Sequence, residues 1–375
     1  NIYFLIKELW MKKIIITLPA LKSVSPVRAA LALIKGLCKD FEIIVVSLDS
    51  SIKENSIEPE LKNLNIKIIY LEKNGIKNIF KAGNKFQEVL NQIDTDIIVS
   101  YLLRADIVTS MANTKANKIS SIRNMIVQEY VLSHGNAIGN IFGFLHKLAL
   151  KRFDKVIVMS SDMKKYFIDN GFKPSQLELI HNCLDEEDLK SKMDDNVNLP
   201  FKLFQPTIVT ASSLIKRKNI SLLLNTTLKL MENGNKFNVL IIGDGNERAN
   251  LFNQVNTSKF KENFHFLGHI SNPIPYIDKS DIFVMTSLSE GVSRSLMEAL
   301  YLGKTCIVGN IPGNKELINN KINGFLYNTE TELLNIIQEQ LTIKNKNNNL
   351  LPIEFRYDIS LKKHKKLLKD MVLVN

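Results

Sequence analysis

Short runs of β-branched and other apolar residues recur along the first half of the chain, separated by longer segments with helix-like spacing. Each run is apolar on both faces, which is typical of a strand in a parallel sheet that helices cover on both sides. The pattern therefore predicts an α/β fold, with strands at residues 13–18, 42–48, 66–71, 96–101, 118–122 and 155–160.

An acidic, asparagine-rich stretch interrupts this pattern after "ELIHNCLD" (178–185), and Pro200 and Pro206 follow it. Such a break in composition between two α/β runs indicates a linker, here near residues 186–205. The alternation then restarts, with strands expected at 206–212, 237–245, 263–269, 281–287, 304–310 and 324–328.

Two Rossmann-like domains are therefore expected, with parallel sheets facing across a cleft, because ligands bind beyond the carboxyl ends of parallel strands. The boundaries predicted are 11–190 for an N-terminal domain and 200–350 for a C-terminal domain. A basic helix is expected at 354–375.

The length of 375 residues agrees with two domains of ordinary size. Lysine and arginine number 49 against 38 acidic residues, so the net charge is +11 and an anionic partner is expected. Nucleic acid is the weakest candidate because no zinc-finger, basic-zipper or RNA-binding signature occurs. An anionic membrane surface and a phosphate-bearing substrate remain, while the basic run "KKHKKLLK" (362–369) favours a solvated helix face.

Cysteine and histidine spacing predicts no metal site. Cys38, Cys183 and Cys306 lie far apart without a C-x-x-C motif, which argues against a disulfide framework and indicates a reducing compartment. Only His265 and His269 are four residues apart, and they flank an expected strand end rather than one helix face.

No apolar run reaches the roughly 18 residues that a membrane span needs, so we expect a soluble, cytoplasmic protein. The first ten residues, "NIYFLIKELW", lack the features of a signal peptide. We expect Met11 to be the natural start.

The segment "SEGVSRSLMEALYLGK" (289–304) has the boundary signals of a helix. Ser293 is predicted to cap it, Ser295 and Glu298 resemble a capping box, and Gly303 is placed to end it. Glu290 precedes this helix on a glycine-containing turn.

The amides of Gly291, Val292 and Ser293 would then point out of a helix N-terminus, which is an anion-binding arrangement. A helical side chain tilts toward the N-terminus, so Glu298 can reach the same place. There it would repel a phosphate but could accept hydrogen bonds from ribose hydroxyls, and Glu290 could serve a second sugar. Plain helix capping is the alternative.

These residues carry a family resemblance. The segment "SEGVSRSLMEALYLGKTCIVGNIPGNKELI" (289–318) resembles the donor site of glycosyltransferase family 4 (glycosyl transferases group 1), retaining enzymes of the GT-B fold. Their signature is two glutamates separated by seven residues, followed by a small-residue strand and a G…E-L-I element. Similar segments cover most of the chain: "TASSLIKRKNISLLL" (210–224), "VLIIGDGNERANL" (239–251), "FLGHI" (266–270) and "LIHNCLD" (179–185).

The resemblance implies that Glu298 binds the ribose and that Glu290 binds the donor sugar near the reacting carbon. It implies that the turn amides hold the diphosphate and that Lys218 neutralises charge on the leaving group. Where the family has an arginine, five residues before this lysine, the chain has Ser213, and Lys216 and Arg217 lie close enough to substitute.

The N-terminal half also departs from the family. In "LKSVSPVRAAL" (21–31), Ser25 is one of the residues that stand where the family has glycines, which we expect to alter acceptor contacts. Arg123 and then His134 are the predicted acceptor-side residues, with ordinary loop residues as the alternative. The stretch "FGFLHKLALKRF" (142–153) favours a buried helix with a basic edge over docking on an anionic membrane.

Two lookalike motifs are set aside. "DTD" at 94–96 matches the metal-binding triplet of the other main glycosyltransferase fold, but it precedes its strand instead of following it. "GDGNER" at 243–248 begins like a dinucleotide fingerprint but has Arg248 in place of the third glycine, so a tight turn is expected.

The sequence therefore predicts a retaining glycosyltransferase that moves a sugar from a nucleotide-sugar, with UDP favoured, to a glycan or lipid-linked acceptor. The resemblance implies a role in bacterial surface polysaccharide synthesis and no cofactor or metal. It also implies that the N-terminal domain binds the acceptor, that the C-terminal domain binds the donor, and that the basic helix at 354–375 packs back on the N-terminal domain. Peripheral contact with the inner face of the cell membrane stays open as an alternative to a purely cytoplasmic protein. The alternatives are a nucleotide-sugar epimerase of similar shape and a degenerate, non-catalytic partner subunit.

Overall fold

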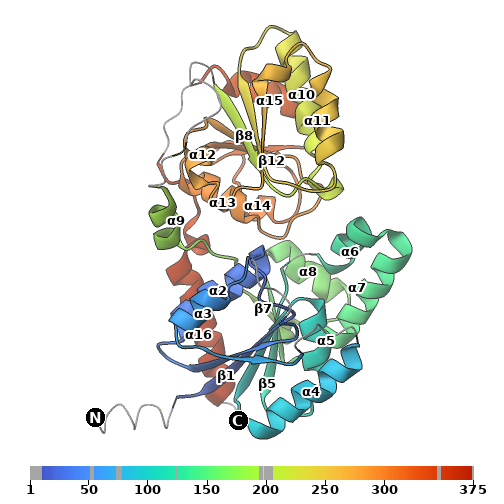
Figure 1. Cartoon of the computed structure of the whole chain (residues 1–375), viewed down its shortest axis with the longest axis vertical. Coiled ribbons are helices and arrows are strands. Elements are labelled where there is room, and N and C mark those ends of the chain that lie inside the picture. Colours follow the sequence, from blue (N-terminus) through green and yellow to red (C-terminus); the bar gives the residue numbers. More distant parts are fainter. Residues whose placement is uncertain are drawn as a thin grey trace. The chain divides into compact units, whose positions relative to one another are not determined.

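A computed structural model describes residues 11–50, 55–72, 78–123, 125–193, 197, 206–343 and 348–373. The chain divides into two compact units (Figure 1). The first unit is Asn1–Cys183 together with Asp358–Asn375, and the second is Leu184–Tyr357. Residues 1–10, which we expected to precede the natural start, lie outside the described residues, as does most of the predicted linker after residue 193.

The first unit contains a parallel sheet in the order β3-β2-β1-β4-β5-β6-β7. Its strands are β1 (Lys13–Leu18), β2 (Glu42–Ser47), β3 (Lys67–Tyr70), β4 (Ile97–Tyr101), β5 (Asn117–Ser121), β6 (Lys155–Val158) and β7 (Leu177–Leu179).

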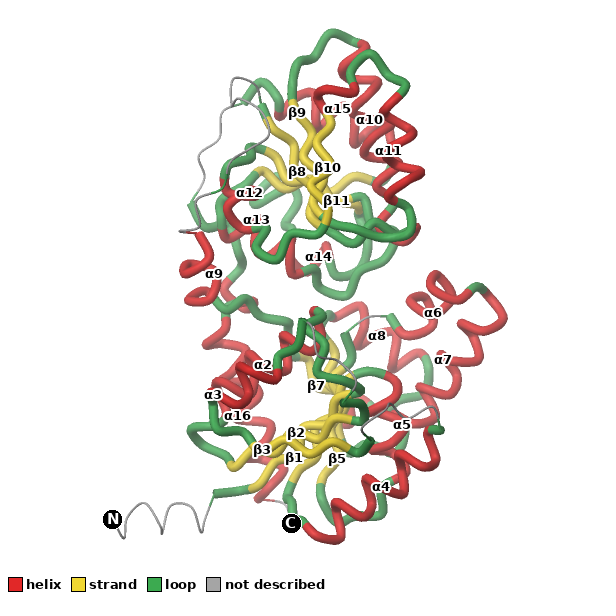
Figure 2. Tube along the Cα trace, in the orientation of Figure 1, coloured by secondary structure: helices red, strands yellow, loops and turns green. Residues whose placement is uncertain are grey.

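Helices cover both faces of this sheet, as the doubly apolar strands predicted (Figure 2). In β1, Ile14 and Ile16 pack on the face covered by α2 (Ser25–Leu37), α3 (Glu58–Asn63) and α16 (Tyr357–Leu373). Ile15 packs on the opposite face, which α4 (Ile79–Gln92) and α5 (Leu103–Met111) cover. All three side chains are fully buried, and each contributes about 1.5–3 kcal/mol of hydrophobic free energy. The helices are α2 (Ser25–Leu37), α3 (Glu58–Asn63), α4 (Ile79–Gln92), α5 (Leu103–Met111), α6 (Ile126–His134), α7 (Asn136–Leu150), α8 (Ser161–Asp169) and α16 (Tyr357–Leu373), with a 3-10 turn, η1 (Pro174–Gln176).

The C-terminal helix α16 belongs to the first unit although the whole second unit precedes it. Leu367, Leu368 and Met371 join the core against β1, and Asn117 donates a hydrogen bond of 2.8 Å to the carbonyl of Met371. Most lysines of its basic run are exposed, so the run is a solvated helix face, as predicted.

The second unit contains a parallel sheet in the order β10-β9-β8-β11-β12-β13. Its strands are β8 (Thr207–Ala211), β9 (Asn238–Ile242), β10 (Phe264–Gly268), β11 (Ile282–Met285), β12 (Thr305–Gly309) and β13 (Phe325–Tyr327). Its helices are α9 (Glu186–Met193), α10 (Ile220–Glu232), α11 (Arg248–Asn256), α12 (Ile274–Asp278), α13 (Arg294–Tyr301), α14 (Asn314–Leu317) and α15 (Glu330–Gln340), with 3-10 turns η2 (Lys216–Lys218), η3 (Lys261–Asn263) and η4 (Ile353–Phe355).

All of the predicted strands are present, with two corrections nearby. The strand β7 was missed, because three residues are too few to show a period. The stretch predicted as a linker begins with the helix α9, whose Leu189 is buried and whose acidic residues occupy the favourable first turn. Acidic composition was therefore wrongly interpreted there as loop.

The two lookalike motifs have the structural roles that we predicted. Asp96 accepts a hydrogen bond of 2.9 Å from the amide of Lys13, so the "DTD" triplet leads into β4. The "GDG" turn follows β9, where a side chain on Gly243 would lie 1.8 Å from the carbonyl oxygen of Ser212. This turn therefore supports the loop after β8 from behind.

Candidate active site

The turn between β11 and α13 carries the first glutamate of the predicted donor site. Gly291, Val292 and Ser293 are buried in this turn, directly before α13. Within the described part of the chain, the amides of Val292 and Ser293 donate no hydrogen bond, and they precede the positive end of the helix dipole. The turn is therefore equipped to hold an anion.

The capping prediction is partly wrong. Ser293 occupies the N-cap position, but its side chain makes no capping bond and lies 3.2 Å from the hydroxyl of Ser295. Ser295 lies inside the helix, and Glu298 bonds to Arg294 instead of closing a capping box. Gly303 follows the helix with φ of 69°, as predicted for its end.

Glu290 is 7% exposed and forms ion pairs with two cations from the loop after β8. Lys218 Nζ donates to Glu290 Oε1, and Arg217 Nη1 lies 3.4 Å from Oε2. Arg217 also donates to the carbonyl of Ser289 at 2.7 Å. We call Glu290, Lys218 and Arg217 the ion-pair cluster.

The charge state of Glu290 follows from this environment. Burial alone would raise the pKa of Glu290, but the charges of Lys218 and then Arg217 hold that pKa below its ordinary value. The carboxyl is therefore ionised at neutral pH. Two cations and one carboxylate leave the cluster with a net charge of about +1, which favours an incoming anion.

Hydrogen bonds hold the loop after β8 from two directions. Leu214 accepts a hydrogen bond of 2.9 Å from the amide of Glu247, and its own amide donates 2.9 Å to Asp244 in the "GDG" turn. The hydroxyl of Thr286, after β11, donates to the carbonyl of Asn219 at 2.9 Å. Ser213 lies on this loop with its side chain exposed and has no part in the ion-pair cluster.

Sequence reasoning did not single out Gly313, which packs against the same turn from the loop after β12. Its φ is 84°, and an added Cβ would lie 1.4 Å from the carbonyl oxygen of Gly291. Only glycine fits there without moving the turn. The glycine of the G…E-L-I element was the available signal.

Glu298 lies in a separate charged chain on α13. Its Oε1 accepts a hydrogen bond of 2.9 Å from Arg294 Nε, and Arg294 Nη2 lies 3.4 Å from Asp188 of α9. Burial alone would lower the pKa of Arg294, but Glu298 and Asp188 raise it overall. The guanidinium thus fixes the orientation of Glu298.

The three predicted acceptor-side residues, Arg123, His134 and Ser25, all lie in the first unit. Among the described residues, no hydrogen bond or ring contact links one of them to another. Arg123 follows β5 and donates a hydrogen bond of 3.0 Å to Asn182. His134 is exposed at the end of α6, with its ring centroid 5.4 Å from that of Phe142. Ser25 is exposed at the first position of α2.

A buried polar network in the first unit also escaped the sequence reasoning. Asp106 of α5 is fully buried and accepts hydrogen bonds from the hydroxyls of Ser100 and Ser120. His146 of α7 lies 2.7 Å from its other oxygen, and the hydroxyl of Tyr130 lies 3.0 Å from the second ring nitrogen. This chain ties α6 and α7 to the sheet.

The helix α7 is not the buried helix that the sequence favoured. One of its sides exposes Ile138, Ile141, Phe144, Leu145 and Leu148, to between 45% and 58%. We call these five residues the α7 apolar row. The buried side is narrow and carries glycines and His146, so periodicity alone pointed to the wrong surface.

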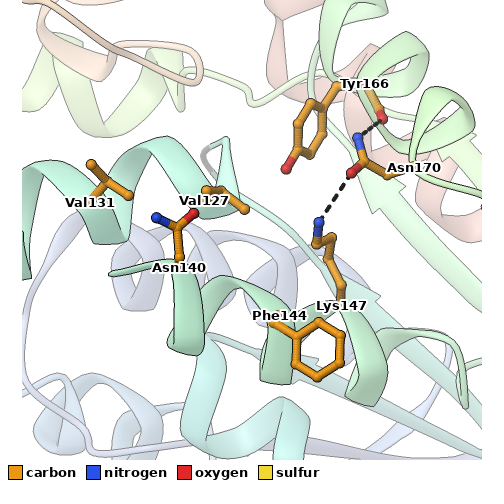
Figure 3. A pocket seen from close by; sticks show the side chains of 7 residues that line it. All are labelled: Val127, Val131, Asn140, Phe144, Lys147, Tyr166 and Asn170. Atoms are coloured by element: carbon orange, nitrogen blue, oxygen red, sulfur yellow. Dashed lines mark hydrogen bonds between the residues drawn. The ribbon is translucent and has the colours of Figure 1, made fainter. Parts of the chain in front are cut away.

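A pocket of about 590 Å³ lies beside this row (Figure 3). The amine of Lys147 points toward Asn170 and donates to its side-chain oxygen at 3.0 Å. The lining residues come from α6, α7, α8 and the residue after α8: Val127, Val131, Asn140, Phe144, Lys147, Tyr166 and Asn170.

The described residues contain neither a metal-binding cluster nor a helix suited to span a membrane. No group of three or more histidine, cysteine, aspartate or glutamate side chains is arranged to bind a metal ion. No helix in the described ranges combines the length and the apolar character needed to cross a membrane.

Comparisons with known proteins place most of the chain in a family. The family Glycosyl transferases group 1 matches residues 191–351, and Glycosyltransferase Family 4 matches residues 27–188. The O-antigen biosynthesis glycosyltransferase WclY of Escherichia coli is 28% identical over 68% of this chain and 72% of its own. The UDP-Gal:alpha-D-GlcNAc-diphosphoundecaprenol alpha-1,3-galactosyltransferase of Escherichia coli is 25% identical over 77% of this chain and 74% of its own.

Among solved structures, Anabaena HepE in complex with UDP-glucose superimposes with a TM-score of 0.75 at 19% identity, over 96% of this chain and 99% of HepE. That likeness extends through both units and shows the fold. The two family matches cover most of the sequence and establish that this chain belongs to the group 1 glycosyltransferases, enzymes of the GT-B fold.

Proposed function

We propose that the enzyme transfers a sugar from a UDP-sugar to a lipid-linked glycan, with retention of the anomeric configuration, in bacterial surface polysaccharide synthesis. The observation that carries the proposal is the ion-pair cluster beside the amides at the start of α13. Relatives named for O-antigen synthesis and for a UDP-Gal donor with a diphosphoundecaprenol acceptor support it.

In this proposal the turn amides and the two cations hold the diphosphate. Lys218 and Arg217 neutralise the charge that develops as the leaving group departs, and electrostatic stabilisation of this kind is usually the largest single term in catalysis. When the diphosphate pairs with the two cations, Glu290 is released from its ion pairs and accepts hydrogen bonds from hydroxyls of the sugar. Glu298 accepts hydrogen bonds from the ribose hydroxyls. No protein nucleophile is assigned.

Calorimetric titration with UDP, GDP and UMP tests donor binding. We expect UDP to bind most tightly, and Glu298→Gln to weaken it by about tenfold, because a charge-assisted hydrogen bond contributes about 1.5–3 kcal/mol. The exposed Glu339→Gln on α15 is the matched control. Absence of all nucleotide binding would refute the enzyme's proposed donor and favour the partner-subunit alternative.

The chemistry has its own tests. Proton NMR of the product formed from a UDP-sugar should show the donor's anomeric configuration, and an inverted product would contradict retention. Activity should persist in EDTA, since we propose that no metal is required. Conversion of the UDP-sugar to its epimer without any acceptor would instead support the epimerase alternative.

We also propose that the α7 apolar row contacts the membrane that carries the acceptor. An exposed apolar helix side next to Lys147 and Lys151 is suited to an anionic bilayer surface. Phe144→Ser with Ile141→Ser should reduce sedimentation with phosphatidylglycerol vesicles. The control is Ile322→Ser, which removes an exposed apolar residue of the second unit, and equal sedimentation of both variants would contradict the assignment.

A further inference from the structure

Arg123 is a partly buried cation without an anionic partner. Its guanidinium Nη1 donates to Asn182 at 3.0 Å and lies 3.6 Å from the sulfur of Met159, and none of the described carboxylates pairs with it. Its Nε is buried and has no hydrogen-bond partner within the described ranges. A partly buried charge in this state costs free energy, and an anion beside the guanidinium would lower that cost.

The other buried arginines differ in this respect. Arg217 pairs with Glu290, and Arg294 pairs with Glu298 and Asp188. The fold therefore supplies carboxylates to buried guanidinium groups in the second unit. The group on Arg123 receives only neutral neighbours.

Arg123 also lies at the edge of the sheet where ligands bind. It follows the end of β5 by two residues, and its contacts come after β6 and β7. Its Cζ lies 5.3 Å from the ring centroid of Tyr101, the last residue of β4. The carboxyl ends of parallel strands are the usual location of a ligand in open α/β sheets.

Two buried hydroxyls lie beside the guanidinium at this edge, those of Tyr101 and Ser121. Tyr101 interacts with both Arg123 and Ser121, but within the described ranges neither hydroxyl makes a hydrogen bond of ordinary geometry. Tyr101 and Ser121 are neighbours in register on β4 and β5. Hydroxyl donors beside an unpaired guanidinium match the requirements of an oxyanion.

His364, which senses the charge of Arg123, adds no positive charge of its own. Burial and then Arg123 itself lower the pKa of His364, to about 4, despite the hydrogen bond of Nδ1 to the carbonyl of Ser360 at 2.9 Å. Burial likewise lowers the pKa of Arg123. The guanidinium is thus the charge that an anion would meet.

We propose that Arg123, with the hydroxyls of Tyr101 and Ser121, binds a phosphoryl or carboxylate group of the acceptor. That the ligand is an acceptor rests on the proposed function, whereas binding of an oxyanion does not. Both sources of the oxyanion are open: the diphosphate of a lipid carrier or the carboxylate of an acidic sugar.

The experiment titrates inorganic pyrophosphate and, separately, glucuronate into the full chain saturated with UDP, so that the donor site is occupied. We expect one of them to bind and Arg123→Met to weaken it by about tenfold or more. Arg123→Met should also match or exceed the wild-type thermal midpoint without ligand, because an uncompensated charge is removed. Arg152→Met, which changes an exposed arginine of the same unit, should alter neither result.

Preference for pyrophosphate would identify the carrier diphosphate, and preference for glucuronate an acidic sugar. The inference is overturned if neither anion binds, if Arg123→Met binds as the wild type does, or if Arg123→Met is destabilised or fails to fold, since the cation would then be structural. Failure of UDP to bind would concern the proposed donor site alone, and the same titrations without UDP would still test Arg123.

Discussion

Replacing Lys218 by methionine separates the electrostatics of the ion-pair cluster from its packing. Methionine keeps much of the apolar stem but leaves Glu290, which is 7% exposed, with Arg217 at 3.4 Å as its remaining cation. Breaking a buried pair by removing one partner costs about 3–5 kcal/mol. Because Arg217 remains, we expect a loss of about 2 kcal/mol in the free energy of unfolding, or about 4–8 °C in thermal midpoint for a unit of this size.

The assay is thermal unfolding of four proteins: the wild type, Lys218→Met, Glu290→Gln and the double variant. If the loss arises from the uncompensated carboxylate, the double variant should be more stable than Lys218→Met alone. Lys216→Met, which changes the exposed neighbour in η2, should leave the midpoint unchanged. A Lys218→Met protein as stable as the wild type, or a double variant that loses the sum of both single effects, would refute this reasoning.

Three further changes test other parts of the fold. Gly313→Ala should lower the free energy of unfolding by at least about 2 kcal/mol and weaken UDP binding, because the new Cβ collides with the carbonyl of Gly291. Gly135→Ala is the control: its φ is similar but the space around it is open, so it should cost only backbone strain of about 1–2 kcal/mol. Asp106→Ala removes the acceptor of two buried hydroxyls and an imidazole, so chemical denaturation should show a loss of about 3 kcal/mol; an unchanged midpoint would contradict the network. His364 has a pKa of about 4 in the folded protein, so between about pH 4 and 6.5 the unfolded chain binds more protons than the folded one. Its contribution to the free energy of unfolding, up to about 3 kcal/mol, is fully present above pH 6.5 and is lost as the pH falls to 4. The variant His364→Leu should flatten this part of the profile of stability against pH.

The strands were predictable because each is a run of apolar residues with opposite faces buried, as Ile14 and Ile15 show in β1. The outward side of α7 was not predictable, because hydrophobic periodicity is interpreted on the assumption that apolar residues are buried. In α7 the apolar residues are the exposed ones. Helix α9 was missed for a related reason: a single buried leucine anchors it, and the rest of its sequence is as polar as a linker.

The candidate donor site was predictable where its chemistry is local in sequence. Glu290 and the turn amides lie within a few residues, and the helix signals around them are strong. The contact of Gly313 with the turn, and the network around Asp106, join residues from different loops and strands. Such contacts depend on how the sheet brings strand ends together, which no local pattern encodes.

Ser213 and the altered loop at 21–31 are the two departures from the family that motivate the partner-subunit alternative, and the ion-pair cluster weakens the argument from Ser213. Arg217 lies on the same loop as Ser213 and reaches Glu290 from the side opposite to Lys218, binding the other carboxylate oxygen. A purely structural ion pair would need one cation to neutralise the carboxylate of Glu290, but two cations lie beside it. The second cation leaves the ion-pair cluster with a net positive charge next to the amides of Val292 and Ser293. The positive charge that an arginine at 213 would supply is therefore present by another route, and we expect the proposed diphosphate not to require that arginine.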